Sequence, residues 1–139
     1  MVVALLHLAT ALFSEAEAVA QQSEFKVVVN ADNPLSEIDR DQLSKLFLKR
    51  ARKTEARPVD QSESSQVREA FSKEIHGRSV KAIKSYWLRM IFSGDASAPP
   101  ELGSDQAVLS YIAANGDAIG YVGSDVAIPG NLKVVTVVN

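Results

Sequence analysis

The sequence contains no cysteine among its 139 residues. Disulfide bonds, thiolate metal sites and a cysteine nucleophile are therefore excluded. Histidine is also scarce, since His7 and His76 are the only two in the chain. His7 falls in an apolar N-terminal segment far from His76, so neither a histidine-based catalytic triad nor a histidine metal cluster is expected.

A strong excess of either charge is missing as well. The chain has 15 Lys and Arg against 17 Asp and Glu, which gives a net charge of −2. This composition shows no strong positive charge of the kind that binds nucleic acid or an acidic membrane. Hydrophobic residues make up 46% and charged residues 23%, as in an ordinary globular protein. The length suits one domain with a single core, built without a cofactor or metal to stabilise it.

Basic residues are absent before the N-terminal apolar run, which covers residues 2–13. This run is too short to cross a bilayer as a helix. Ala18-Val19-Ala20 fits the small-residue pattern that precedes a secretory cleavage site. We therefore predict a cleaved export signal over residues 1–20 and one domain over residues 21–139. The alternative is an N-terminal helix packed on the domain.

Hydrophobic periodicity predicts alternating strands and helices in the domain. Three consecutive valines, Val27 to Val29, indicate a strand buried on both faces between layers of helices. Asp39, with Gln42 three residues later, fits a capping box at a helix start. Further strands are predicted over residues 57–60, 118–122 and 133–138, and further helices from the serines at 62–65 to Gly77, over 79–92 and over 104–115. This order predicts an α/β fold with helices on both faces of a sheet.

Spacing in the helix over residues 79–92 predicts a core-facing side. Tyr86-Trp87 could alternatively form an aromatic ligand platform. Gly120, inside a predicted buried strand, suggests the close approach of another backbone. The residues expected to face the core from this helix are Val80, Ile83, Trp87, Met90 and Ile91.

Two groups of basic residues are expected to lie at the ends of helices. The run Lys49 to Lys53 could attract an anion or a negatively charged partner, but it is also typical of a solvated helix terminus. His76 lies in the last turn of its predicted helix, where a positive charge complements the helix dipole.

A hydroxyl-rich turn, which we call the serine turn (residues 62–65), lies between a strand end and a helix start. Ser62, Ser64 and Ser65 stand where a helix leaves backbone N–H groups without partners and carries the positive end of its dipole. Hydroxyls beside such groups can donate hydrogen bonds to a bound oxyanion. The alternative is that Ser62 or Ser64 simply caps the helix and the rest is a solvated turn.

The segment Gln61 to Val67 resembles the Arg-Ser-Asp-Gly-Ser-Gly-Thr turn that holds phosphate in periplasmic phosphate-binding proteins of ABC uptake systems. Asp41 to Leu48 resembles the helix that opens the second lobe of those proteins, and Ala118 to Val122 resembles a late strand. Order and spacing agree over residues 25–138. The resemblance implies a single lobe of the type II periplasmic-binding-protein fold, with a mixed, mostly parallel sheet and helices on both faces.

The resemblance also implies a ligand site for phosphate or a similar oxyanion. The phosphate-contacting serine of the family falls on Ser65, while Gln61 replaces its arginine and Val67 its threonine. The backbone N–H groups of Gln66 and Val67 remain available, and Arg68 is a replacement charge or a solvent-exposed residue. Asn30 is added as a candidate because it ends the first predicted strand, and ligands bind at carboxyl ends of strands in open α/β sheets.

Three functions remain in view. The first is a non-enzymatic periplasmic solute-binding domain for ABC-type uptake, in which a second copy, a partner protein or a transporter membrane component closes the open groove. The second is a non-catalytic periplasmic interaction module that keeps the fold and has lost the ligand. The third is a serine hydrolase built on the serine turn. The lack of a histidine base and of a glycine elbow argues against this third function.

Overall fold

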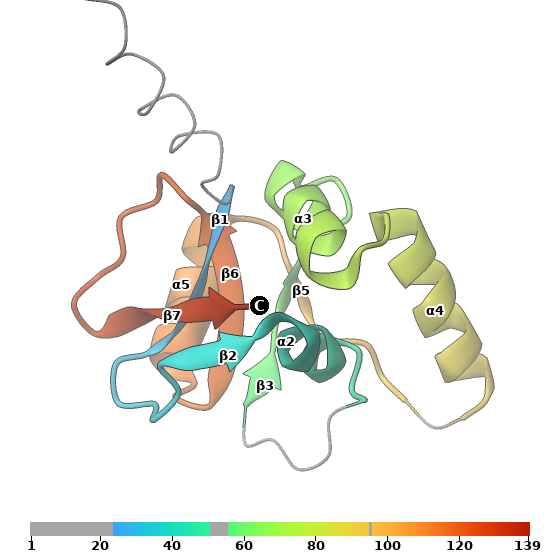
Figure 1. The fold of residues 1–139 in the computed structure, drawn as a ribbon, viewed down its shortest axis with the longest axis horizontal. Coiled ribbons are helices and arrows are strands. Elements are labelled where there is room, and N and C mark those ends of the chain that lie inside the picture. The colour runs from blue at the N-terminus through green and yellow to red at the C-terminus, as the bar shows by residue number, and fades with distance from the viewer. Residues whose placement is uncertain (1–23, 51–55, 95) are drawn as a thin grey trace, which may run out of the picture.

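The computed structural model describes residues 24–50, 56–94 and 96–139, and the predicted export signal lies outside these ranges. Its centre is a five-stranded sheet in the order β2-β7-β1-β6-β3 (Figure 1). The strands of this sheet are β1 (Phe25–Asn30), β2 (Glu37–Asp39), β3 (Arg57–Pro58), β6 (Ala118–Gly123) and β7 (Leu132–Val138). A two-stranded sheet pairs β4 (Asp60–Gln61) with β5 (Glu101–Leu102). The helices are α2 (Arg40–Phe47), α3 (Gln66–Phe71), the π-helical turn η1 (Ser72–His76), α4 (Val80–Phe92) and α5 (Asp105–Ala114).

The central strand β1 runs against the rest of the five-stranded sheet. It pairs antiparallel with both β6 and β7, whereas β2 is parallel to β7 and β3 is parallel to β6. The other four strands therefore share one direction, and the predicted mixed, mostly parallel sheet is confirmed. A consequence is that the carboxyl end of β1 lies at the opposite end of the sheet from the carboxyl ends of its neighbours.

Helices cover both faces of the sheet, as predicted. Phe25, Val27 and Val29 of β1 pack on one face with α2, α3 and η1, while Val28 packs on the other face with α5. This alternation follows from the two-residue period of a strand. All three valines are at most 1% exposed.

Gly120 lies where α5 approaches β6. A Cβ atom at this position would stand 2.8 Å from Val108 Cγ1 and 2.9 Å from Val59 Cγ2, closer than carbon atoms pack. The predicted close approach therefore exists, but it is made by two valine side chains and not by another backbone.

Helix starts follow the polar residues that the sequence places there. The Asp39 carboxylate accepts hydrogen bonds from the backbone N–H groups of Asp41 and Gln42 and so caps α2 as expected. The return hydrogen bond of a capping box, from the Gln42 side chain to Asp39, is not made among the described residues. Ser79 and Ser104 cap α4 and α5 in the same way. The helical stretch that begins with α3 ends at Gly77, whose φ of 63° closes it in the left-handed region.

Helix α4 stands at the edge of the molecule, away from the five-stranded sheet (Figure 1). Its inner side packs in a small cluster in which Ile83 and Trp87 meet Leu48, and the Tyr86 hydroxyl donates to the Leu48 carbonyl at 2.9 Å. Tyr86 and Trp87 thus contribute to packing. The prediction that Ile91 faces the core is wrong, because its side chain is 50% exposed.

The predicted strand over residues 57–60 divides between the two sheets. The Val59 N–H donates to the Ile119 carbonyl in β6, and the next N–H, that of Asp60, donates to the Pro100 carbonyl beside β5. The chain therefore crosses from the large sheet to the small one at this point. This crossing places the start of the serine turn at the edge of the small sheet.

Two negative findings concern the part of the chain that the structure describes. None of its helices combines the length and apolar character that a membrane span requires. Its histidine, aspartate and glutamate side chains also form no group of three or more placed to hold a metal ion.

Candidate functional site

The serine turn joins β4 to α3 and is fixed at both ends. The Ser62 N–H donates to the Leu102 carbonyl of β5 at 3.0 Å, and the Ser65 N–H donates back to the Ser62 carbonyl at 3.0 Å. The Ser65 hydroxyl oxygen accepts from the Arg68 N–H at 3.2 Å and so caps α3. The cap expected at Ser62 or Ser64 is therefore wrong, because the helix begins at Gln66. The strand, turn and helix expected from the sequence are therefore all present.

Gln61 is buried beneath the turn and links it to the core. The Ser65 hydroxyl donates to Gln61 Oε1 at 2.7 Å. The Gln61 side-chain amide in turn donates to the Tyr121 carbonyl at 2.9 Å and to Asp105 Oδ1 at 2.8 Å. With 3% of its surface exposed, Gln61 is a structural residue of the turn.

Arg68 is buried and paired with acids. Its Nη1 atom donates to Glu101 Oε1 at 2.6 Å and to the Gln61 carbonyl at 2.8 Å, and its Nε atom lies 3.5 Å from Asp60 Oδ1. Only 4% of the residue is exposed. The sequence left open a free replacement charge or a solvent-exposed side chain, and the structure shows neither.

Asp60 and Tyr121 complete the buried group. The Tyr121 hydroxyl and the Gln61 N–H both donate to Asp60 Oδ1. Burial raises the pKa of Asp60 above its usual value, although the charge of Arg68 acts in the opposite direction. Burial, together with the neighbouring Asp60 charge, also raises the pKa of Tyr121, so the phenol keeps its proton at any physiological pH. We call Asp60, Gln61, Ser65, Arg68, Glu101, Asp105 and Tyr121 the polar cluster.

Most members of the polar cluster are absent from the sequence-based site. An aspartate at the end of a strand and a tyrosine inside an otherwise apolar strand were the available signals, at Asp60 and Tyr121. Glu101 and Asp105 lie more than thirty residues further along the chain, in β5 and α5. Glu101 reaches Arg68 because β4 pairs in parallel with β5, and no local sequence pattern predicts that pairing.

The outer groups of the serine turn are not used by the protein. Among the described residues, no hydrogen bond involves the hydroxyls of Ser62 and Ser64 or the side-chain amide of Gln66, and Ser64 and Gln66 are exposed. The N–H groups of Gln66 and Val67 lie in the first helical turn, where no carbonyl of the same helix can reach them. These groups are neutral donors available to a ligand.

The charges around the turn are mainly negative. Within the polar cluster, the carboxyl groups of Asp60 and Glu101 flank the single guanidinium of Arg68, and Asp105 accepts from the Gln61 amide. Glu63, in the turn itself, pairs with Lys84 of α4 at 3.1 Å. Among the described residues, the cations that contact the turn, Arg68 and Lys84, already have acidic partners, so an oxyanion there would depend mainly on neutral donors.

Asn30 lies apart from the serine turn. It pairs with Leu132 at the carboxyl end of β1, and its side-chain oxygen accepts from the Asp32 N–H at 3.1 Å. Asn30 also lines a cavity of about 850 Å³ together with Gly116 and Asp117, which precede β6. Because β1 opposes the other strands, this cavity and the serine turn lie at opposite ends of the sheet.

His76 does not complement the helix dipole as expected. Its Nδ1 atom lies 2.7 Å from the Ser44 hydroxyl oxygen, and its ring meets Phe71 edge-on with centroids 5.6 Å apart. Burial lowers the pKa of His76 to about 4, and the nearby charges of Arg78 and Arg68 act in the same direction. The imidazole is therefore neutral at pH 7 and connects η1 to α2.

The basic run Lys49 to Lys53 falls partly outside the described residues. Lys49 itself has a φ of 53°, and its ammonium donates to the Ser97 hydroxyl at 3.2 Å. This contact places Lys49 beside the loop that follows α4.

Comparison with solved structures identifies proteins of the same fold. An ABC-type phosphate transport receptor from Vibrio cholerae aligns over 82% of this chain and 46% of its own, with a TM-score of 0.63 and 17% identity. A Clostridium perfringens structure with bound phosphate, described as an ABC transporter substrate-binding protein, aligns over 82% of this chain and 44% of its own, with a TM-score of 0.64 and 13% identity. PstS from Borrelia burgdorferi gives 82% and 47% coverage, a TM-score of 0.56 and 15% identity.

The chain has the fold of these binding proteins. At such low identity the comparison establishes the fold alone, and it confirms the fold that the sequence resemblance implied. The chain spans a little under half the length of each of these three structures. The sequence matches no protein-family model, and no curated protein is significantly similar to it.

Proposed function

We propose that this domain binds phosphate or a related oxyanion on the outer side of the serine turn, as an exported solute-binding domain for ABC-type uptake. Its fold is shared with phosphate-binding proteins, one of which was crystallised with phosphate. The observation that carries the proposal is the strand–turn–helix at β4 and α3, where free hydroxyl and N–H donors gather. An export signal over residues 1–20 and a periplasmic location agree with this role.

The free donors would contact the oxyanion, and the buried ones would hold the turn. The hydroxyls of Ser62 and Ser64 and the N–H groups of Gln66 and Val67 are the contacts we assign. The Ser65 hydroxyl donates its proton to Gln61, so it reaches a ligand only by exchanging that hydrogen bond.

Binding by this domain alone should be weak. Tight oxyanion binding requires many convergent donors in a cleft that excludes water. The serine turn offers neutral donors only, and Arg68 is held by Asp60 and Glu101. A second surface that closes over the turn, from another copy, a partner protein or a transporter membrane component, would supply the missing contacts.

Thermal unfolding in the presence of titrated phosphate tests the proposal, with sulfate and chloride as competing anions. A ligand that binds only the folded state raises the midpoint with the logarithm of its concentration over its dissociation constant. We expect a rise specific to phosphate or one related oxyanion, reduced in Ser64→Ala and retained in Ser110→Ala, an exposed serine of α5. No rise at millimolar anion would contradict the proposal and favour an interaction module that has lost its ligand.

A further inference from the structure

The outer face of α4 exposes a compact group of large apolar side chains. Leu88 is 48% exposed, Ile91 50% and Phe92 88%. Positions three and four apart lie on the same side of a helix, so these side chains form one patch at the carboxyl end of α4. Single exposed apolar residues are ordinary, but a group on a helix at the edge of the molecule marks an interaction surface.

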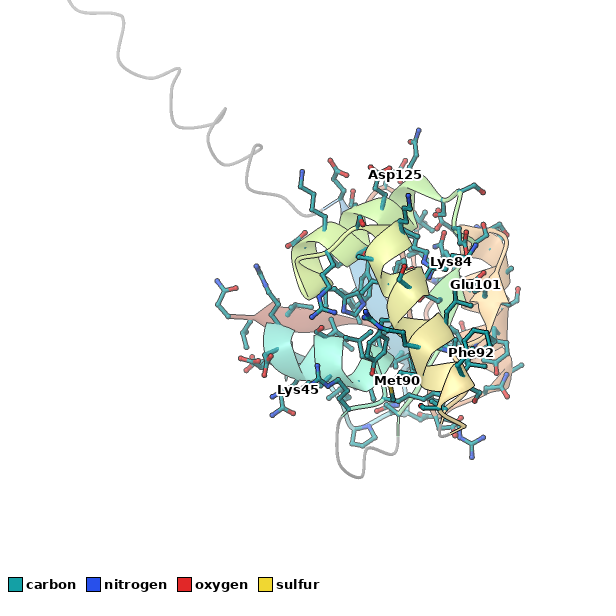
Figure 2. All side chains as sticks on the ribbon, turned by 90° about the vertical axis from the view of Figure 1, so that its right-hand side faces the viewer. Lys45, Lys84, Met90, Phe92, Glu101 and Asp125 are labelled. Atoms are coloured by element: carbon teal, nitrogen blue, oxygen red, sulfur yellow. The ribbon has the colours of Figure 1, made fainter. Side chains whose placement is uncertain are left out.

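Positive side chains continue the same face toward the amino end of α4. Lys81 and Lys84 precede Leu88 by seven and four residues, which places them in line with it along the helix. Arg89 is also exposed, and α4 contains no acidic residue. Figure 2, in which α4 is turned toward the viewer, shows Lys84 and Phe92 at different heights along this helix. We call Lys81, Lys84, Leu88, Ile91 and Phe92 the α4 face.

More cations flank the α4 face at both ends. At the amino end, Lys73 and Arg78 join Lys81 around a cavity of about 530 Å³, which Glu63 and Glu69 also line. At the carboxyl end, the Lys49 ammonium reaches the loop after α4 through Ser97. Among the described side chains around this face, the one ion pair is that of Lys84 with Glu63.

We propose that the α4 face docks on an anionic lipid surface. Exposed aromatic and aliphatic side chains beside lysine and arginine are the features by which helices lie in the headgroup region of acidic membranes. The overall charge of −2 conceals this local excess, in which Lys73, Arg78, Lys81, Lys84 and Arg89 outnumber the neighbouring acids Glu63 and Glu69. A second copy packed face to face with its α4 parallel would bring Lys81 and Lys84 close to the same cations of its partner, so that arrangement is disfavoured.

Docking requires no rearrangement of α4. Ile83 and Trp87 fix its inner side against Leu48, so the helix is already folded when its outer face meets the lipid. Phe92, Ile91 and Leu88 would enter the boundary between headgroups and acyl chains, while the cations remain at the level of the phosphates. This surface adjoins the serine turn at the Lys84–Glu63 ion pair but shares none of the free donors of that turn, so the inference stands independently of the proposed function.

Because the chain lacks cysteine, single-cysteine labels can test this docking in the full chain. We would attach an environment-sensitive fluorophore at Ser93→Cys, next to Phe92, and at Ser110→Cys on α5 as the matched control, both exposed positions. Vesicles of phosphatidylglycerol and phosphatidylcholine in equal parts are compared with vesicles of phosphatidylcholine alone. We expect a blue shift at position 93 with the anionic vesicles, weakened by high salt, and no shift at position 110.

Variants of the face provide the second arm of the test. We expect Ile91→Ser with Phe92→Ser to weaken co-sedimentation with anionic vesicles about tenfold, whereas Val134→Ser, at a residue of β7 about as exposed as Ile91, leaves it unchanged. The apolar run at residues 2–13 is common to all variants and cannot produce a difference between them. Equal shifts at positions 93 and 110, or none, would overturn the proposal. So would vesicle binding that is indifferent to the double variant, and a protein partner would then be the occupant to seek.

Discussion

Two helices of this chain end in the same pattern, Arg-x-x-Phe, in opposite surroundings. In α3, Arg68 is 4% and Phe71 1% exposed, and Phe71 stacks on Tyr121 with ring centroids 3.9 Å apart. In α4, Phe92 is 88% exposed and Arg89 also faces solvent. The difference arises from what each helix follows and meets, since α3 continues from β4 onto the sheet while α4 rests on a small peripheral cluster. The same local pattern is therefore compatible with a helix in either place, but it does not determine whether its arginine and phenylalanine are buried or exposed.

The largest expected effect separates the two arginines. Arg68→Ala leaves the Asp60 carboxyl buried without its cation and should lower the free energy of unfolding by about 3–5 kcal/mol. Arg89→Ala removes an exposed side chain that forms no ion pair with any described residue, and it should change the free energy of unfolding by no more than about 0.5 kcal/mol. Urea unfolding of both variants measures the contrast. Similar losses in the two variants would contradict the assignment of Arg68 as a structural residue.

His76, which packs on Phe71 of the buried helix α3, should make the free energy of unfolding depend on pH, with an effect of intermediate size. Its folded pKa of about 4 lies below the ordinary value of 6.5, so the unfolded chain takes up the proton first. The stabilisation is complete above about pH 6.5 and declines as the pH falls toward 4, by up to about 3 kcal/mol. Urea unfolding across this range should show a smaller decline in His76→Gln. Parallel declines in both proteins would place the dependence on other groups.

A smaller effect distinguishes two serines of the serine turn. Ser65→Ala removes the α3 cap and the hydrogen bond to Gln61, and should cost about 1 kcal/mol of unfolding free energy. Ser64→Ala alters a hydroxyl that no described residue contacts and should leave stability unchanged. Chemical denaturation checks both variants. A greater loss in Ser64→Ala would reverse the division between supporting and ligand-contacting residues.

The smallest expected effect concerns Phe92. Because its side chain is almost fully exposed, Phe92→Ser should change the free energy of unfolding by no more than about 0.5 kcal/mol. The matched variant Val134→Ser should behave similarly. A loss of several kcal/mol in Phe92→Ser alone would show that α4 contributes to the core through this residue, and it would remove the basis for an interaction face.

Elements with long periodic patterns were predictable from the sequence. The valines of β1, the cap of α2, the starts of α4 and α5, and the helix end at Gly77 all appear where predicted. The short strands β2 and β5 were missed, because two or three residues carry no periodicity and form strands only where a neighbour offers an edge. Ile91 was misassigned because the spacing in α4 identifies an apolar side but not how far the supporting surface extends.

The site was predictable in position but not in connectivity. The serine turn lies between strand and helix as expected, but its capping residue is Ser65 and not Ser62 or Ser64, because α3 begins at Gln66. The pairing of Arg68 with Asp60 and Glu101 depends on a strand contact between distant segments. The separation of Asn30 from the turn likewise depends on the direction of β1, which the sequence did not reveal.

Amide N–H correlation NMR of the nitrogen-15-labelled chain, titrated with phosphate, tests the proposed oxyanion site most directly. The account predicts shifts centred on the first turn of α3, at Gln66 and Val67, with little change in α4. Shifts confined to the basic cavity at Arg78 to Lys81 would place anion binding at the amino end of α4. That result would contradict the assignment of the oxyanion site to the serine turn. An unchanged spectrum at millimolar phosphate would contradict oxyanion binding by this domain altogether.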